Sequence, residues 1–205
     1  EDVKYVEKEN GLLERHTVRR RPGTVGISAA IMQRYGLTVI PHLICGGQSR
    51  YDIEDALIDL DFLGIQNVLA LRGDNLKGEH TFRNHPDGHL HASELVEQIE
   101  RMNRGVFIDG EVEQCHNTNF CIGVAGYPEK HAEAPNKAED LRRLKEKVDA
   151  GAAYIITQMS FDSAKILSFI DDCRAAGIDV PIVPGIKPFS TKAQLTMLPQ
   201  IFHVD

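Results

Sequence analysis

The chain has 205 residues, of which 42% are hydrophobic and 26% charged, so it can bury one sizeable core and gives no reason for a second domain. We therefore expect a single domain over residues 1–205. Its formal net charge of −7 argues against nucleic acid or an anionic membrane as the main partner. No apolar stretch is long enough to span a bilayer, and the four cysteines lack metal-type spacing, so we expect a reduced, cytoplasmic protein without a metal site.

Strand-like and helix-like segments alternate along most of the chain. The segment up to Pro22 is charged and does not resemble a barrel strand, and a helix is expected to begin near Gly23. Five runs, most of them rich in β-branched residues, are expected to form strands at residues 37–44, 67–74, 121–128, 153–159 and 180–186. Apolar stripes at helical spacing predict helices at residues 52–63, 92–102, 138–150 and 163–176, followed by a last helix that Ser190 can cap.

This alternation predicts the α/β class with a parallel sheet, which can be either doubly wound or closed into a barrel. No GxGxxG motif follows the first strand, which disfavours the doubly wound dinucleotide-binding fold. A full eight-stranded barrel usually needs about 250 residues, and fewer strands are expected here. We therefore predict an incomplete (β/α)8 TIM barrel with about strands 3 to 7 present, and we expect the chain to be a fragment or to have lost its ends.

Polar and charged residues follow the expected strands at their carboxyl ends, where the chemistry of β/α barrels takes place. The motifs there are PHLIC (41–45), LALRGD (69–74), GVAGYPEKH (123–131) with DLRRLKEKVDAGA (140–152), TQMSFD (157–162) and PIVPGIKP (181–188). In this order, and over nearly the whole chain from about residue 22, they resemble the methylenetetrahydrofolate reductase family.

The resemblance implies a barrel that binds FAD at the carboxyl ends of its strands. It implies a ping-pong reaction in which NAD(P)H gives a hydride to the flavin and leaves, after which 5,10-methylenetetrahydrofolate is reduced to 5-methyltetrahydrofolate. This reaction belongs to one-carbon metabolism and methionine biosynthesis. A homo-oligomer is expected for the full-length protein.

The resemblance also assigns site residues. Asp74 is the implied catalytic residue, since a carboxylate beside the flavin and the pterin tunes the flavin potential and assists folate binding; from the residues alone, a helix N-cap is equally reasonable. The implied cofactor-binding residues are His42, Arg72, Gly73, Asp74, His91, Ala92, Tyr127, His131, Ala134, Asp140 and Lys147. The implied substrate-binding residues are Asp74, Gln158 and Gln194.

Several of these assignments have plain structural alternatives. Arg72 could form a surface ion pair, and His42 could be an ordinary structural histidine. Asp140 and Lys147 are seven residues apart and so share one helix face, but that face, with Arg142 and Arg143 nearby, could simply be solvated. At position 91 the family often has an aromatic residue that stacks on the flavin, where this chain has a histidine.

Two features of the family's pattern are missing from the sequence. The general-acid glutamate of the family belongs to a segment like FEFFPP, and neither that segment nor an FAD-contacting threonine of the second strand is found here. Glu129 cannot take over the role by motif, because it belongs to YPEKH. We therefore expect these 205 residues alone to lack the chemistry with folate.

One loop is unusually rich in histidine. His80, His85, His89 and His91 could together bind zinc or nickel, but nothing in the sequence guarantees the geometry that a metal needs. A loop that covers the flavin is the interpretation we favour.

Two other functions fit parts of the sequence. A barrel lyase or aldolase would use Lys187 or Lys147 to form a Schiff base, which requires a desolvated amine with a lowered pKa. A non-catalytic fragment is the remaining alternative. Flavin absorption in the full-length protein would support the reductase, whereas borohydride trapping of a colourless protein with a carbonyl substrate would support the lyase.

Overall fold

The structure is a computed structural model, and it describes residues 2–8, 12–18, 21–74, 82, 84–111, 117–188 and 190–202. Its centre is a five-stranded parallel sheet in the order β3-β4-β7-β8-β9. The strands are β3 (His42–Ile44), β4 (Asn67–Leu71), β7 (Cys121–Gly126), β8 (Tyr154–Met159) and β9 (Ile182–Gly185). Each strand joins the same growing edge, without the reversal of strand order that a doubly wound sheet has. The sheet is therefore that of a partial β/α barrel.

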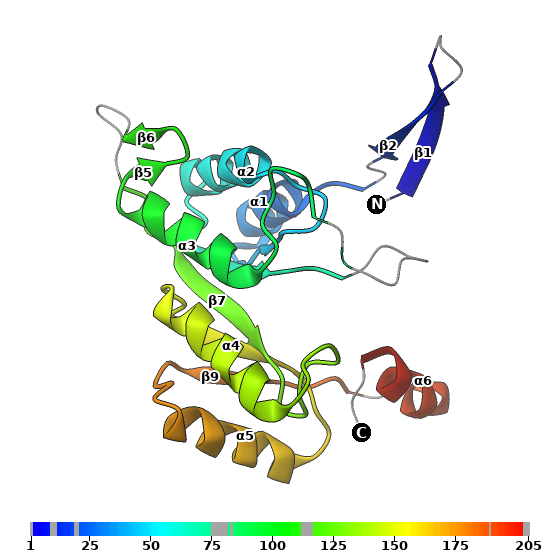
Figure 1. Ribbon diagram of the computed structural model, residues 1–205, viewed down its shortest axis with the longest axis vertical. Helices are drawn as coiled ribbons and strands as arrows, with labels where there is room; N and C mark the ends of the chain where they lie inside the picture. Colours follow the sequence, from blue (N-terminus) through cyan, green and yellow to red (C-terminus); the bar gives the residue numbers. More distant parts are fainter. Residues whose placement is uncertain are drawn as a thin grey trace.

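Helices connect the strands, as the alternation predicts. They are α1 (Thr24–Tyr35), α2 (Arg50–Phe62), α3 (Ala92–Asn103), α4 (Lys137–Asp149), α5 (Ser163–Ala175) and α6 (Lys192–Phe202). In Figure 1, α2 and α3 lie on one side of β7, and α4 and α5 lie on the other. Among the described residues, no helix has both the length and the apolar character that a bilayer crossing needs.

Two short hairpins lie outside the main sheet. The strands β1 (Asp2–Glu7) and β2 (Leu13–Val18) pair with each other in antiparallel fashion, and Figure 1 shows them standing away from the helices. The strands β5 (Val106–Phe107) and β6 (Gly110–Glu111) form a second hairpin after α3. The sequence predicted neither hairpin, although it did predict that the segment before Pro22 adds no strand to the barrel sheet, and this is confirmed.

The core lies between the sheet and its helices. On β4, Val68 and Ala70 are fully buried and belong to the core cluster, whereas Leu69 and Leu71 point to the opposite face. The helices contribute apolar side chains at helical spacing, namely Ile53, Leu57 and Leu60 from α2 and Leu95, Val96, Ile99 and Met102 from α3. The sheet therefore packs against helices on one face and leaves its other face for a site.

The first strand of the sheet is shorter than the sequence predicts. The expected strand at residues 37–44 begins only at His42, and Leu37 and Ile40 are exposed. Pro41 lacks an N–H and cannot donate to a neighbouring strand, although its carbonyl accepts a hydrogen bond from the Leu69 N–H at 2.9 Å. The last helix begins at Lys192, close to where it was expected.

The close packing of β7 against α5 gives a test of the fold. A Cβ at Gly126 would lie 2.8 Å from Cγ2 of Ile155 and 2.9 Å from Cζ of Phe169. We expect Gly126→Ala to lower the free energy of unfolding by about 1–3 kcal/mol, measured by urea denaturation. Gly26→Ala in α1 is the matched control, because nothing lies within 4 Å of its Cβ and helix propensity should raise stability by about 0.5–1 kcal/mol. An unchanged midpoint for Gly126→Ala would contradict this packing.

Candidate functional site

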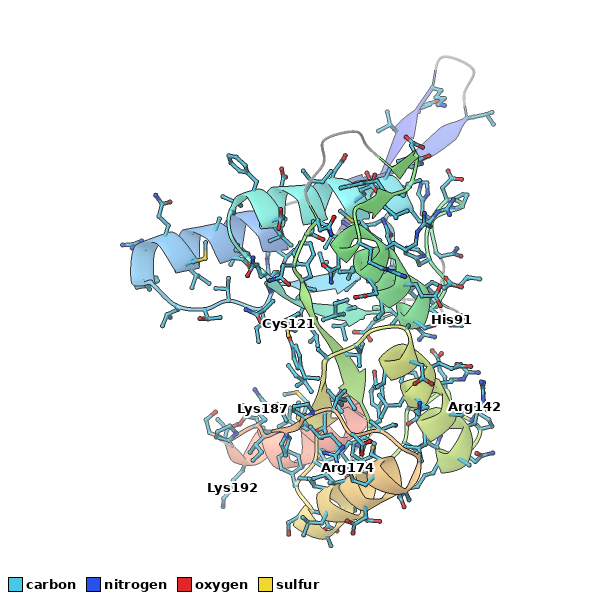
Figure 2. The ribbon with its side chains drawn as sticks, turned by 90° about the vertical axis from the view of Figure 1, so that its left-hand side faces the viewer. His91, Cys121, Arg142, Arg174, Lys187 and Lys192 are labelled. Carbon is cyan, nitrogen blue, oxygen red and sulfur yellow. The ribbon has the colours of Figure 1, made fainter. Side chains whose placement is uncertain are left out.

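One cavity of about 860 Å³ opens at the carboxyl ends of the strands. Its apolar floor comes from the sheet, through Ile44, Leu69, Leu71, Ala125 and Ile156. Every predicted site residue except Gln194 lines it, that is His42, Arg72, Gly73, Asp74, His91, Ala92, Tyr127, His131, Ala134, Asp140, Lys147 and Gln158. Figure 2 shows His91, at the start of α3, and Arg142, on α4, on the same side of the molecule, one above the other.

The turn after β4 brings a charged triplet to the cavity. Gly73 adopts φ +90°, a conformation that side chains rarely tolerate, and this lets the chain turn sharply between Arg72 and Asp74. A Cβ at Gly73 would also come within 3.4 Å of Ile44. Asp74 is exposed and lines the cavity, so its carboxylate is available as an acceptor.

Arg72 forms a two-pronged ion pair with Glu133 across the cavity. Its Nη1 lies 2.6 Å from Oε2 of Glu133 and its Nη2 lies 2.8 Å from Oε1. The guanidinium carbon also lies 4.8 Å from the centre of the Phe82 ring. The hydrogen bonds hold the pKa of Glu133 below its usual range and raise that of Arg72. The sequence offered two interpretations of Arg72, a cofactor-site residue or a partner in an ion pair. In the structure Arg72 both lines the cavity and forms an ion pair.

The loop after β7 places two rings together. Tyr127 and His131 meet edge to face, with ring centres 4.7 Å apart. Burial raises the pKa of Tyr127 and lowers that of His131, so both are neutral at pH 7. The Glu133 N–H donates to Nδ1 of His131 at 3.1 Å, which leaves Nε2 of the neutral ring as the protonated nitrogen. His131 can therefore donate a hydrogen bond.

A strained residue holds this loop in shape. Lys130 has φ +99°, the only positive φ of a non-glycine residue in the described part of the chain. Its ammonium donates to the carbonyl of His131 at 2.9 Å and to that of Ala134 at 2.5 Å. The His131 N–H in turn donates to Oδ2 of Asp140 at 3.0 Å. The loop is therefore tied to itself and to α4.

Helix α4 supplies a row of charges to the cavity. Lys147 donates to the Ala125 carbonyl at 2.6 Å, and burial lowers the pKa of its amine to about 8, with Asp140 opposing this shift. Lys147 and Asp140 also border a second cavity of about 270 Å³ between α4 and α5, so the lysine lies between two hollows. The residue as a whole is partly exposed, but its amine is desolvated enough to lower its pKa.

Several lining residues were missed by the sequence analysis, namely Ser93, Glu133, Arg142, Arg143, Glu146 and Thr157. A signal for Arg143 was present, because positions 140, 143 and 147 share one helix face. Arg142 and Arg143 both pair with Glu139, which is the solvated arrangement that the sequence offered as the alternative. Glu133 lies in a loop and had no local signal.

Two glutamines were expected at the substrate, and the structure separates them. Gln158 lies at the cavity one residue before the end of β8, where its Oε1 accepts the Met159 N–H at 2.9 Å and leaves the amide nitrogen as a donor. Gln194 does not line the cavity, and its Oε1 accepts the backbone N–H of Ser190 at 2.7 Å at the start of α6. Its role in folate binding stays a prediction.

The described histidines of the histidine-rich loop have separate surroundings. His91 lines the cavity, as His42 and His131 do, whereas Nε2 of His89 lies 2.5 Å from the side-chain oxygen of buried Gln98, and Nδ1 of His85 accepts the Asp87 N–H. Within the described ranges, no three potential metal ligands gather at one place. His80 lies outside the described residues.

Comparison with known proteins decides the family. The sequence model of the family "Methylenetetrahydrofolate reductase" matches residues 15–205. This chain belongs to the methylenetetrahydrofolate reductase family. It is 40% identical over 160 residues to methylenetetrahydrofolate reductase 2 of Saccharomyces cerevisiae, covering 77% of this chain and 24% of that protein. It is also 40% identical over 175 residues to 5,10-methylenetetrahydrofolate reductase of Pectobacterium carotovorum, covering 85% of this chain and 52% of that protein.

The chain thus spans about a quarter of the yeast reductase and about half of the bacterial one. Among solved structures, 2,3-dimethylmalate lyase resembles it with a TM-score of 0.52 at 11% identity, covering 87% of this chain and 62% of the lyase. That likeness concerns the fold alone, and it agrees with the barrel-like α/β architecture predicted from the sequence of this reductase family member.

The desolvated lysine gives a pH-dependent prediction. The pKa of Lys147 is about 8 in the folded protein and has its ordinary value of 10.5 in the unfolded chain. Between pH 8 and pH 10.5 the unfolded state therefore binds more protons than the folded state. The free energy of unfolding of the ligand-free protein should therefore rise with pH relative to that of Lys147→Met, by at most about 1.4 kcal/mol per pH unit. Denaturant titrations from pH 8 to 10.5 measure this difference. Lys145→Met is the control, because the Lys145 ammonium pairs with Asp149. The free energy of unfolding of this variant should change with pH as that of the wild type does. Equal pH slopes for both variants would contradict the desolvation of Lys147.

Proposed function

We propose that this chain forms the FAD-binding part of an enzyme that reduces 5,10-methylenetetrahydrofolate to 5-methyltetrahydrofolate with NAD(P)H. The observation that supports it is the convergence of strand-end motifs, far apart in sequence, on one cavity. They are the motifs on which the resemblance to the reductase family rests, except PIVPGIKP, which does not line the cavity. The match to the family's sequence model does not depend on the cavity.

The cavity fits FAD in its chemistry. Arg72, Arg143 and Lys147 line the cavity and supply cations for a diphosphate. The apolar floor suits a planar ring, and the bare backbone of Gly73 allows close approach of a ligand. When bound, FAD would supply the hydride transfer between the nicotinamide and the folate.

The residues of the chain would bind and orient the reactants. Asp74 would disfavour extra negative charge on the reduced ring and accept hydrogen bonds from the pterin. Gln158 would offer its amide nitrogen to a pterin acceptor, and the Gly185 N–H holds the end of β8 by donating to the Thr157 hydroxyl at 2.9 Å. The sheet floor would exclude water from one face of the ring.

We further propose that the enzyme works in the cytoplasm as a homo-oligomer and has neither nucleic acid nor membrane as its main partner. The acidic net charge supports the absence of polyanionic partners, and the three cysteines of the described residues are all unpaired. The single-domain interpretation of residues 1–205 stays part of this proposal.

The deciding experiment uses the full-length protein. Purified without added flavin, it should show flavin absorption, and this absorption should bleach with NADH or NADPH and recover when methylenetetrahydrofolate is added. A colourless protein that also binds no added FAD would overturn the proposal.

A lyase with a Schiff-base lysine is the second candidate, because the lowered pKa of Lys147 is what such an amine needs. Lys187, the other candidate lysine, lines neither cavity, and Figure 2 shows it beside α6, well separated from Arg142. Borohydride trapping of a carbonyl substrate on Lys147 would favour the lyase. Flavin-dependent oxidation of NAD(P)H would favour the reductase.

The role of Asp74 can be separated from cofactor retention. In the full-length enzyme, Asp74→Asn should lower kcat/KM with folate by roughly 10- to 100-fold, since it removes a charge-assisted hydrogen bond. The Kd for FAD should change by less than about threefold, because the arginine and lysine contacts remain. Asp87→Asn, outside the cavity lining, is the control. Equal losses in turnover and FAD affinity would contradict the role given to Asp74.

A further inference from the structure

Arg72 and Glu133 are 61 residues apart, yet they meet at the cavity in a two-pronged ion pair. We propose that Glu133 is a positioning residue that orients the Arg72 guanidinium for the diphosphate of the flavin dinucleotide. This inference rests on the proposed function and assigns a role to a residue that no motif indicated.

The donors of Arg72 are only partly used by the protein. A guanidinium has five N–H groups, and Glu133 accepts from two of them, one on each terminal nitrogen. Within the described ranges, no other acceptor contacts Arg72, so three N–H groups remain for a ligand. Phe82 lies over the face of the guanidinium. Glu133 therefore holds the end of the guanidinium and Phe82 covers its face, while the remaining N–H groups can still donate to a ligand.

The loop that presents Glu133 is itself constrained. Lys130 adopts φ +99° and bonds two carbonyls of the loop, and the Glu133 N–H donates to the ring of His131. The His131 N–H is held by Asp140 of α4. The backbone on both sides of Glu133 is thus tied down, so the position of its carboxylate is determined before any ligand binds.

Orientation outweighs repulsion in this arrangement. Glu133 has half of its side chain exposed (51%), so water screens its repulsion of a bound phosphate. Arg72 is less exposed (24%), and a free arginine would lose rotamer freedom when it binds an anion. Because the ion pair has already restricted that freedom, removing Glu133 should weaken binding of the diphosphate.

The experiment measures FAD binding to the full-length apoprotein by flavin fluorescence. We expect Glu133→Ala to raise the Kd for FAD about tenfold, and Glu133→Gln to lie between it and wild type, since the amide keeps one acceptor oxygen. In an Arg72→Ala background, Glu133→Ala should have no further effect, because Glu133 acts through Arg72. Asp149→Ala removes a carboxylate that pairs with Lys145 outside the cavity lining, and it should leave the Kd within about twofold.

Each outcome decides the inference. Tighter FAD binding by Glu133→Ala would show that Glu133 competes with the ligand, and an unchanged Kd would show that it does nothing; both overturn the proposal. An equal loss in the Arg72→Ala background would show a purely structural role and overturn it too. If Glu133→Ala fails to fold, Glu133→Gln gives the same comparison. Wild type that binds no FAD overturns the proposed function itself, which distinguishes the two failures.

Discussion

Parallel pairing of consecutive strands is the constraint on which the rest of the structure depends. Each strand pairs with the next in the same direction, as His42 does with Leu69 and Asn67 with Cys121, so all carboxyl ends lie on one rim. Within a strand, alternate side chains then face opposite sides. Val68 is therefore buried in the core while Leu69 forms part of the cavity floor, and one short segment builds both the fold and the site.

The charges of the cavity are arranged in opposite pairs. Arg72 meets Glu133, and Arg142 meets Glu146, each with partly exposed side chains. Such pairs contribute at most about 1 kcal/mol each, so their main effect is to set the direction of the cations. Lys147 differs, because its hydrogen-bond partner is the neutral carbonyl of Ala125, and burial lowers its pKa although the Asp140 carboxylate opposes the shift. A bound anion would oppose the shift further.

Local patterns predicted much of the fold and the site, and their limits are physical. Apolar runs followed by polar residues gave the strand ends, and with them Asp74 and Gln158, because a strand and its turn are encoded within a few residues. Pro41 shortened the first strand against that pattern, since a missing N–H outweighs β-propensity. Glu133 could not be predicted, because its importance comes from an arginine 61 residues away.

The contrast between the two glutamines shows why a strand end is a safer prediction than a loop. Gln158 directly follows Thr157, the last residue of β8 that pairs with β7, so its place at the rim follows from the strand even though the pairing with β9 shifts register between Ile156 and Met159. Gln194 lies after a connection whose path the sequence does not determine, and its side chain satisfies backbone N–H groups at the start of α6. An amide at a helix start can always cap locally, and only a ligand that offers a better acceptor and donor set would draw it away.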